Sequence, residues 1–196
     1  VPREYTWDPT LWQMIARRAD EQPDSELVSD EKGALLTAGE FRSRAERLAA
    51  GLWNRGVRPG SIVSWQLPSN IEAMLVFAAL ARIDAVQNPL IMMLREPEVD
   101  FISSQAQASL LIVPGVFRKY DHGAMAERLA LARPGLDVLR LDEGLPDGDP
   151  SVLPGVELLD GERIRWLFYT SGTTAEPKGA RHLDRHLIAS TSIFCH

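Results

Sequence analysis

The chain has 196 residues, enough for one large domain or roughly one and a half small ones. Hydrophobic residues make up 45% of it, which supports a buried core, and 21 basic against 27 acidic side chains give a net charge of −6, which argues against a nucleic-acid partner. The single cysteine, Cys195, cannot form an internal disulfide or a cysteine-rich metal site.

The N-terminal region is expected to hold a helix followed by a hairpin. It begins VPREYTWDPT, which contains no apolar signal core. No later segment approaches the roughly 20 apolar residues of a membrane span, so we expect no integral membrane segment. The single cysteine suits a reducing compartment, so we expect a cytoplasmic protein. Residues 8–22 carry apolar side chains at helical spacing. The apolar runs 26–29 and 34–36, which a turn separates, predict the hairpin.

Two helices with strong start signals follow. Thr37 and Glu40 form a capping box in front of a helix with one apolar stripe. Residues 61–67 are the next predicted strand. Ser69 and Glu72 form a second capping box, and the helix behind it is apolar nearly all round, so we expect it to be buried.

The sequence then continues to alternate strands and helices as far as residue 141. Predicted strands are 85–88, 110–113 and 138–141, and predicted helices begin at Pro97 and span 124–132. Strands that alternate with helices of this length form βαβ units with right-handed crossovers. We therefore predict an α/β fold, with a mostly parallel sheet flanked by helices on both faces.

Residues 143–156 break this pattern, because they are rich in proline, glycine and acidic residues. We expect them to form a surface linker between an α/β part, residues 1–142, and a last part, residues 157–196. The last part is predicted to contain a strand, a loop and the start of a helix.

A polar loop directly follows the strand of this last part. Residues 164–169 are interpreted as a buried strand. Backbone donors and hydroxyls in the loop can hold phosphate oxygens, while an ammonium group balances their charge. The order differs from a Walker A loop, in which Lys directly follows Gly and precedes Ser or Thr. The expected phosphate-binding residues are Thr170, Ser171, Gly172, Thr173, Thr174 and Lys178.

Three other interpretations of this region stay open. The loop could be a hairpin turn that binds no ligand. Ser171 could be a hydrolase nucleophile, although it lacks the Gly-x-Ser-x-Gly elbow. His182 and His186 have a spacing that can place two metal ligands on one helix face, although Gly179 and Asp184 suggest that the helix begins after His182.

The string YTSGTT..PKG, residues 169–179, resembles the phosphate-loop signature of adenylate-forming enzymes. This family contains acyl-CoA synthetases, aryl-CoA ligases, luciferases and the adenylation domains of peptide synthetases. Upstream segments are also similar to the family, so the resemblance covers nearly the whole chain; they are residues 36–41, 56–63 and 79–90. The sequence departs from the family pattern at Asp84 and Ala175, where Gly is usual, and at Leu183-Asp184, where a Thr-His pair is common.

The resemblance implies the N-terminal subdomain portion of an acyl-CoA synthetase-like fold, nearest to ligases of fatty or alicyclic acids. Such an enzyme converts ATP and a carboxylic acid to acyl-adenylate, releases pyrophosphate and transfers the acyl group to CoA. Mg²⁺ bridging the phosphates is implied as well. The loop from Thr170 to Lys178 would hold the ATP phosphates, and no catalytic residue and no protein ligand of a metal are expected in this part of the enzyme.

The elements that the family places later in its sequence, such as the magnesium-holding glutamate and the mobile C-terminal domain, have no counterpart here. We therefore expect the N-terminal part of a longer enzyme, inactive by itself. An acyl-AMP ligase or a peptide-synthetase adenylation domain is one alternative, and a non-catalytic nucleotide-binding module is an alternative of another class. We also consider a homodimer, because Leu187, Ile188 and Ile193 are expected to expose apolar surface.

Overall fold

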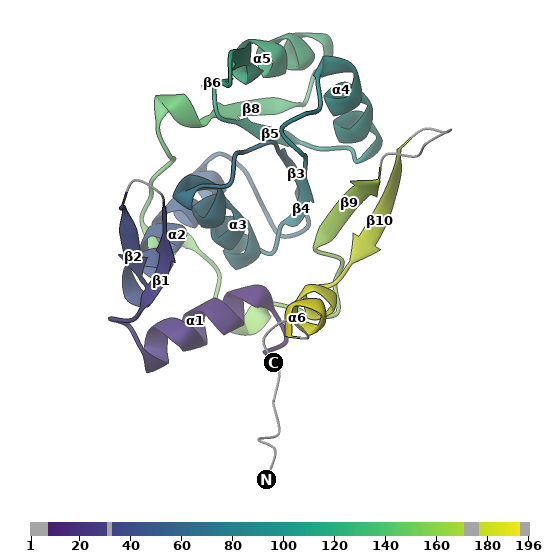
Figure 1. Ribbon diagram of the computed structural model, residues 1–196. Coiled ribbons are helices and arrows are strands. Elements are labelled where there is room, and N and C mark those ends of the chain that lie inside the picture. Colours follow the sequence, from purple (N-terminus) through teal and green to yellow (C-terminus); the bar gives the residue numbers. More distant parts are fainter. Residues whose placement is uncertain (1–7, 31–32, 171–176, 193–196) are drawn as a thin grey trace.

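The computed structural model describes residues 8–30, 33–170 and 177–192 (Figure 1). The helices are α1 (Leu11–Glu21), α2 (Ala38–Asn54), α3 (Ile71–Ile83), α4 (Glu96–Gln105), α5 (His122–Ala132) and α6 (Asp184–Ser192). The strands are β1 (Glu26–Ser29), β2 (Leu35–Thr37), β3 (Ile62–Trp65), β4 (Val86–Pro89), β5 (Leu110–Val113), β6 (Val116–Phe117), β7 (Tyr120–Asp121), β8 (Asp137–Arg140), β9 (Trp166–Thr170) and β10 (Lys178–His182). Short 3-10 turns lie at Leu141–Glu143, Pro150–Val152 and Val156–Leu158.

The centre of the fold is a six-stranded sheet with the order β10-β9-β4-β3-β5-β8. Neighbouring strands in it run parallel, except that β10 is antiparallel to β9. The prediction of an α/β fold with a mostly parallel sheet is therefore confirmed. The separate hairpin near the N-terminus is confirmed as well, because β1 and β2 pair antiparallel.

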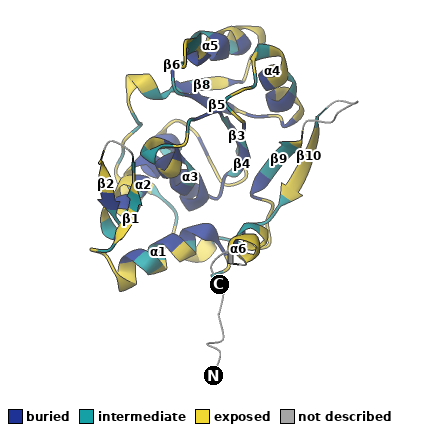
Figure 2. Ribbon diagram, viewed as in Figure 1, coloured by how far each residue is buried: buried dark blue, intermediate teal, exposed yellow. Residues whose placement is uncertain are grey.

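Two apolar clusters cover opposite faces of this sheet. Leu110 and Ile112 of β5 belong to the cluster of α2 and α3, whereas Leu111 and Val113 belong to the cluster of α4 and α5. Successive side chains of a strand point to opposite faces, so helices cover the sheet on both sides. Burial on both faces explains why β5 is a continuous apolar run, dark blue in Figure 2.

The direction of the connections reverses between β3 and β4. The chain passes from β3 through α3 to β4, and then returns through α4 to β5 on the other side of β3. The loops that leave the carboxyl ends of β3 and β4 therefore diverge toward opposite faces. Open sheets of this kind bind ligands in the crevice outside the carboxyl ends of such strands. β9 lies beside β4 and parallel to it, so Thr170 at its carboxyl end faces the same side of the molecule.

Local sequence signals predict most of these elements, but not β10, the pair β6–β7 or the cap of α3. The predicted capping box of α2 is present, but the one of α3, Ser69 with Glu72, is wrong. The cap is the next residue, Asn70, whose side chain accepts a hydrogen bond from the Ala73 N–H at 3.0 Å. Asparagine serves as well as serine at this position. The short antiparallel pair β6–β7 was not predicted.

The predicted linker, residues 143–156, lies at the surface and packs closely on α2. A Cβ atom on Gly51 would lie 2.6 Å from the backbone of residues 146 and 147. A Cβ atom on Gly148 would lie 2.8 Å from the backbone of α2. Both sides of the contact therefore need glycine, and the segment has a fixed place on the helix.

Gly51→Ala is expected to lower the free energy of unfolding by about 1–2 kcal/mol. The new methyl group would overlap backbone atoms, which cannot move aside like the end of a side chain, so we expect a cost of about 2–3 kcal/mol, of which a gain in helix propensity offsets about 1 kcal/mol. Urea unfolding followed by circular dichroism measures the change. Ser43→Ala, on the exposed face of α2, is the control and should change the value by less than about 0.5 kcal/mol. A stability equal to that of the wild type would contradict close packing of the linker.

Candidate functional site

The β9–β10 hairpin carries the predicted phosphate-binding loop. The two strands pair antiparallel, with Thr170 directly opposite Lys178. The hairpin therefore joins both ends of residues 171–177 at the carboxyl end of β9. Lys178 was expected within the loop, but it is the first residue of β10, and it is exposed like Thr170.

Two of the predicted phosphate-binding residues, Thr170 and Lys178, are thus brought together. A hydroxyl donor and an ammonium donor side by side suit an anionic group. The other four, Ser171, Gly172, Thr173 and Thr174, lie outside the described residues, and so does the alternative role of Ser171 as a nucleophile.

A cavity of about 360 Å³ lies between this hairpin and the loop that follows β4. Thr170 and Pro177 line it from the hairpin, and Leu90, Ile91 and Leu94 line it from the other side. The cavity therefore opens at the carboxyl ends of β4 and β9, beside the point where the connections diverge. This is the position at which open α/β sheets bind their ligands.

A buried polar network holds the loop after β4 in place. The Gln66 amide donates to the carbonyl oxygens of Ile91 at 2.9 Å and Leu94 at 3.1 Å, and its oxygen lies 2.9 Å from Nδ1 of His122. Burial, together with the charge of Arg95, lowers the pKa of His122. The neutral ring can then donate from Nδ1 to the Gln66 oxygen. Gln66 lies in the otherwise apolar end of the predicted strand 61–67, and this was the sequence signal for the network.

Gly179, the residue after Lys178, leaves room for an aromatic ring. It pairs with Tyr169, and a Cβ atom at Gly179 would lie 3.0 Å from Cζ of that ring. Tyr169 also lines the cavity beside the loop, where burial raises the pKa of its hydroxyl. The glycine thus allows the tyrosine to pack across the base of the hairpin.

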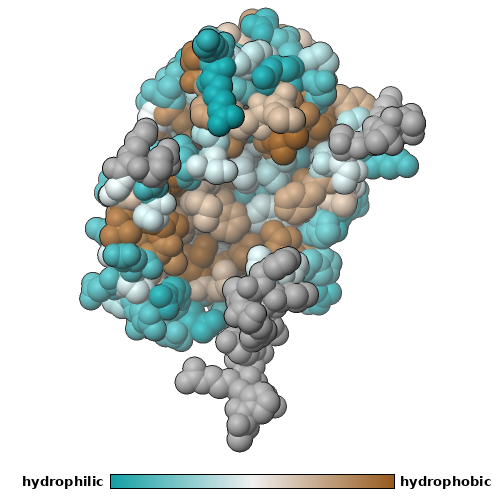
Figure 3. Space-filling model, in the orientation of Figure 1, coloured by the Kyte–Doolittle hydropathy of each residue, from teal (hydrophilic) through white to brown (hydrophobic). Residues whose placement is uncertain are grey.

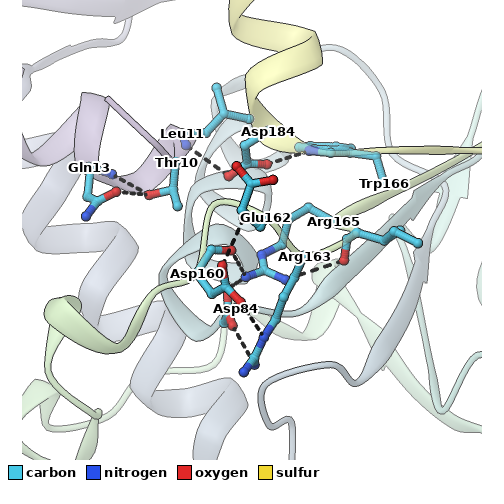
Figure 4. A network of polar contacts seen from close by, with 11 residues as sticks. Thr10, Leu11, Gln13, Asp84, Asp160, Glu162, Arg163, Arg165, Trp166 and Asp184 are labelled. Atoms are coloured by element: carbon cyan, nitrogen blue, oxygen red, sulfur yellow. Dashed lines mark hydrogen bonds and ion pairs between the residues drawn. The ribbon is translucent and has the colours of Figure 1, made fainter. Parts of the chain in front are cut away.

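An ion pair fixes the start of β9 (Figure 4). The Arg165 guanidinium contacts the carboxylate of Asp84, and both side chains are 4% exposed. Burial raises the pKa of Asp84 and lowers the pKa of Arg165, so each charge depends on the other. The φ angle of Asp84 is 68°, a left-handed conformation that glycine adopts most readily. Residues 164–169 were expected to be one apolar strand, but β9 begins after Arg165.

A second buried carboxylate joins three elements. Asp184, at the start of α6, accepts hydrogen bonds from the Leu11 backbone N–H at 2.9 Å and from the Trp166 indole N–H at 2.8 Å (Figure 4). It thereby connects α1 and β9 to α6. The sequence marks Asp184 only as part of the departure from a Thr-His pair, because its partner Leu11 is 173 residues away along the chain.

An apolar groove of about 670 Å³ crosses the face shown in Figure 3, between β1, α3, β9 and α6. Leu187 lines it together with aromatic side chains such as Phe77 and Phe168. The expectation that Ile188 is exposed is wrong, because this residue is 5% exposed and packs with Leu11 and Trp166. Ile193 lies outside the described residues.

The two histidines near the hairpin do not share a helix face. His182 lies on β10 and His186 on α6, with ring centroids 5.8 Å apart, and Nδ1 of His186 accepts a hydrogen bond from the Leu183 N–H at 3.2 Å. Within residues 8–30, 33–170 and 177–192, no group of three His, Cys, Asp or Glu side chains could hold a metal ion. None of the helices in the same ranges is long and apolar enough to cross a membrane.

Comparison with known proteins gives a family match over most of the chain. A family model described as AMP-binding enzyme matches residues 15–196. The medium-chain fatty-acid–CoA ligase of Escherichia coli (strain K12) is 26% identical over 195 residues, which cover 94% of this chain and 34% of that protein. A feruloyl-CoA synthase of an Amycolatopsis species is 35% identical over 167 residues, covering 84% of this chain and 31% of that protein. Peptide synthetases are also among the similar proteins.

Solved structures share the fold. The Mycobacterium tuberculosis fatty acyl CoA synthetase superposes with a TM-score of 0.75 at 24% sequence identity, covering 95% of this chain and 37% of that one. The chain spans about a third of the length of the curated relatives that it matches.

Proposed function

The chain belongs to the AMP-binding enzyme family, and we propose that it is the N-terminal part of an ATP-dependent carboxylic acid:CoA ligase. The observation that supports this proposal most is the β9–β10 hairpin, in which Thr170 and Lys178 flank a segment with three hydroxyl side chains and one glycine. The hairpin lies at the carboxyl end of a parallel sheet, beside the point where its connections diverge.

In the proposed reaction, a carboxylate oxygen attacks the α-phosphorus of ATP, and the bond to the leaving pyrophosphate breaks. The thiol sulfur of CoA then attacks the acyl carbon, and AMP leaves. Charge grows on pyrophosphate in the first step, so donors fixed near the β- and γ-phosphates lower its barrier. We assign this task to Lys178, Thr170 and the residues between them.

Mg²⁺ belongs to the same proposal as a partner of the ATP phosphates. Mg²⁺ prefers oxygen ligands, so the phosphate oxygens of ATP would supply contacts to it. Bound there, the ion would neutralise phosphate charge, and the residues of this chain would orient the phosphates.

Two alternative functions differ from the ligase in the acceptor or in the absence of a reaction. The similarity to peptide synthetases favours an adenylation domain, or an acyl-AMP ligase, whose acceptor is not CoA. A non-catalytic nucleotide-binding module would keep the hairpin and lack the reaction. A cytoplasmic location and a homodimer stay predictions, and light scattering tests the second.

Carboxylate-dependent ATP–pyrophosphate exchange in the whole protein tests the proposal, with a panel of fatty, alicyclic and aromatic acids. Exchange with at least one acid, followed by formation of its CoA thioester, is the expected result. Exchange without thioester would favour the acyl-AMP ligase or peptide-synthetase alternative. ATP binding without exchange would favour the module and contradict the ligase.

The 196-residue chain by itself is expected to show exchange at background level. It carries the phosphate hairpin but spans about a third of the relatives' length, and we propose that the other reaction groups lie in the rest of the enzyme. The same assay on the purified chain measures this. Exchange at a rate comparable to that of the whole protein would show that the chain contains a complete site.

A further inference from the structure

The β9–β10 hairpin has few backbone contacts with the rest of the sheet. Between β4 and β9, one pair of residues is in register, Gln87 with Trp166, whereas β3 and β4 share four such pairs. The Gln87 N–H donates to the carbonyl oxygen of Arg165 at 2.7 Å. A strand attached over so short a length can swing about this point unless side chains hold it.

The residue at this point is Arg165, and its side chain is fully engaged inside the protein. Its guanidinium contacts the Asp84 carboxylate and donates to the carbonyl oxygen of Asp160 at 2.8 Å. The backbone N–H of Arg165 donates to His182 of β10 at 2.9 Å. The same residue therefore contacts β4, β10 and, through Asp84, the end of α3.

Asp84 is held firmly enough to serve as the fixed partner. It is the C-terminal cap of α3 in a left-handed conformation, and its backbone N–H donates to Ala81 at 3.2 Å. Its backbone carbonyl accepts from Gly60 at 2.8 Å. Arg163 lies 3.4 Å from the second carboxylate oxygen, at the surface end of the contact.

We propose that Asp84 and Arg165 are positioning residues, whose ion pair sets the place of Thr170 and Lys178 relative to the carboxyl ends of β3 and β4. Arg165 directly precedes β9, and Thr170 is the last residue of that strand. A small rotation at Arg165 therefore moves Thr170 and Lys178 by a larger distance, since an extended strand rises roughly 3.3 Å per residue. The proposal rests on the proposed function in one respect: the ligand at the hairpin is ATP.

Variants that neutralise one or both charges distinguish a positioning role from a role in stability alone. Removing one partner leaves an uncompensated buried charge, which is strongly destabilising, whereas removing both charges together leaves no buried charge without a partner. Stability should therefore recover in the double variant Asp84→Asn/Arg165→Met. Positioning depends on the ion pair itself, which the double variant also lacks. The affinity for ATP should therefore stay low although the stability recovers.

The experiment compares Asp84→Asn, Arg165→Met and the double variant in the whole protein. We expect lower melting temperatures in both single variants and a melting temperature near that of the wild type in the double variant. The KM for ATP in pyrophosphate exchange should be raised about tenfold or more in all three, because misplacement by about 1 Å can cost up to a hundredfold. Glu162→Gln is the control, since it removes an exposed ion pair with Arg185 near the same hairpin and should change neither quantity.

A double variant with both the melting temperature and the KM for ATP of the wild type would overturn the proposal. Amide hydrogen exchange in the 196-residue chain tests the positioning role without an enzymatic assay. Faster exchange in β9 and β10 of the double variant, with unchanged exchange in β3 and β5, supports the anchor, and unchanged exchange in all four strands contradicts it. Absence of pyrophosphate exchange in the wild type would refute the proposed function and leave this result standing.

Discussion

Lys178→Ala in the whole protein is expected to lower the efficiency of adenylation tenfold to a hundredfold. The Lys178 side chain is exposed at the first residue of β10, and it is the one positive charge among the predicted phosphate-binding residues. A hydrogen bond that involves a charged group contributes roughly 1.5–3 kcal/mol, which corresponds to a rate change of this size. Arg181→Ala, an exposed charge on the same strand, is the matched control and should leave adenylation unchanged.

The two half-reactions separate this role from a general loss of structure. Thioester formation from acyl-adenylate made beforehand involves no pyrophosphate, so Lys178→Ala should nearly spare it. Thr173→Ala should cost less than Lys178→Ala in adenylation, since a neutral donor is lost and neighbouring hydroxyls remain. An equal loss in both half-reactions would show that Lys178 acts through the fold or the adenylate. Unchanged adenylation would remove it from the site.

Asp184→Ala is expected to lower the free energy of unfolding by about 2–6 kcal/mol. The substitution leaves two buried donors, the Leu11 N–H and the Trp166 indole N–H, without their acceptor. Each unsatisfied buried donor costs about 1–3 kcal/mol. Because domains of this kind are stable by only about 5–15 kcal/mol, the variant should also show a lower melting temperature.

Denaturant unfolding of the 196-residue chain measures this loss, with Arg185→Ala as the control. Arg185 is the next residue of α6 and forms an exposed ion pair, so its removal should cost less than about 1 kcal/mol. Trp166→Phe removes one of the two donors as well as part of the ring, so in this background Asp184→Ala should cost only about 1–3 kcal/mol, for the Leu11 N–H that is still left without its acceptor. Fully additive losses would contradict the network.

The order of strands and helices followed from local patterns in the sequence. Apolar runs such as Leu110 to Val113 and the capping box at Thr37 are signals that neighbouring residues carry by themselves. β10 was missed because its residues are nearly all exposed, so no apolar alternation marks it. Its pairing with β9 is what makes it a strand.

The candidate site was predictable only in part. The phosphate-loop signature located Thr170 and Lys178, and the structure adds that they face each other across a hairpin. The ion pair of Asp84 with Arg165 could not be predicted, since nothing local connects residues 81 positions apart (165 − 84). Of the two residues, only Asp84 stood out in the sequence, because it occupies a position at which the resembled family usually has Gly.

Among the described strands, β10 is the last on its side of the sheet, and its free edge affects how readily the 196-residue chain aggregates in solution. A terminal strand presents unpaired backbone N–H and C=O groups that can template a strand of another molecule. Lys178 and Arg181 place positive charges on this strand, a common device against such pairing. Neutralising Lys178 therefore removes a barrier to aggregation together with a phosphate donor. Light scattering of Lys178→Ala beside the wild type therefore distinguishes loss of the phosphate donor from self-association of the variant.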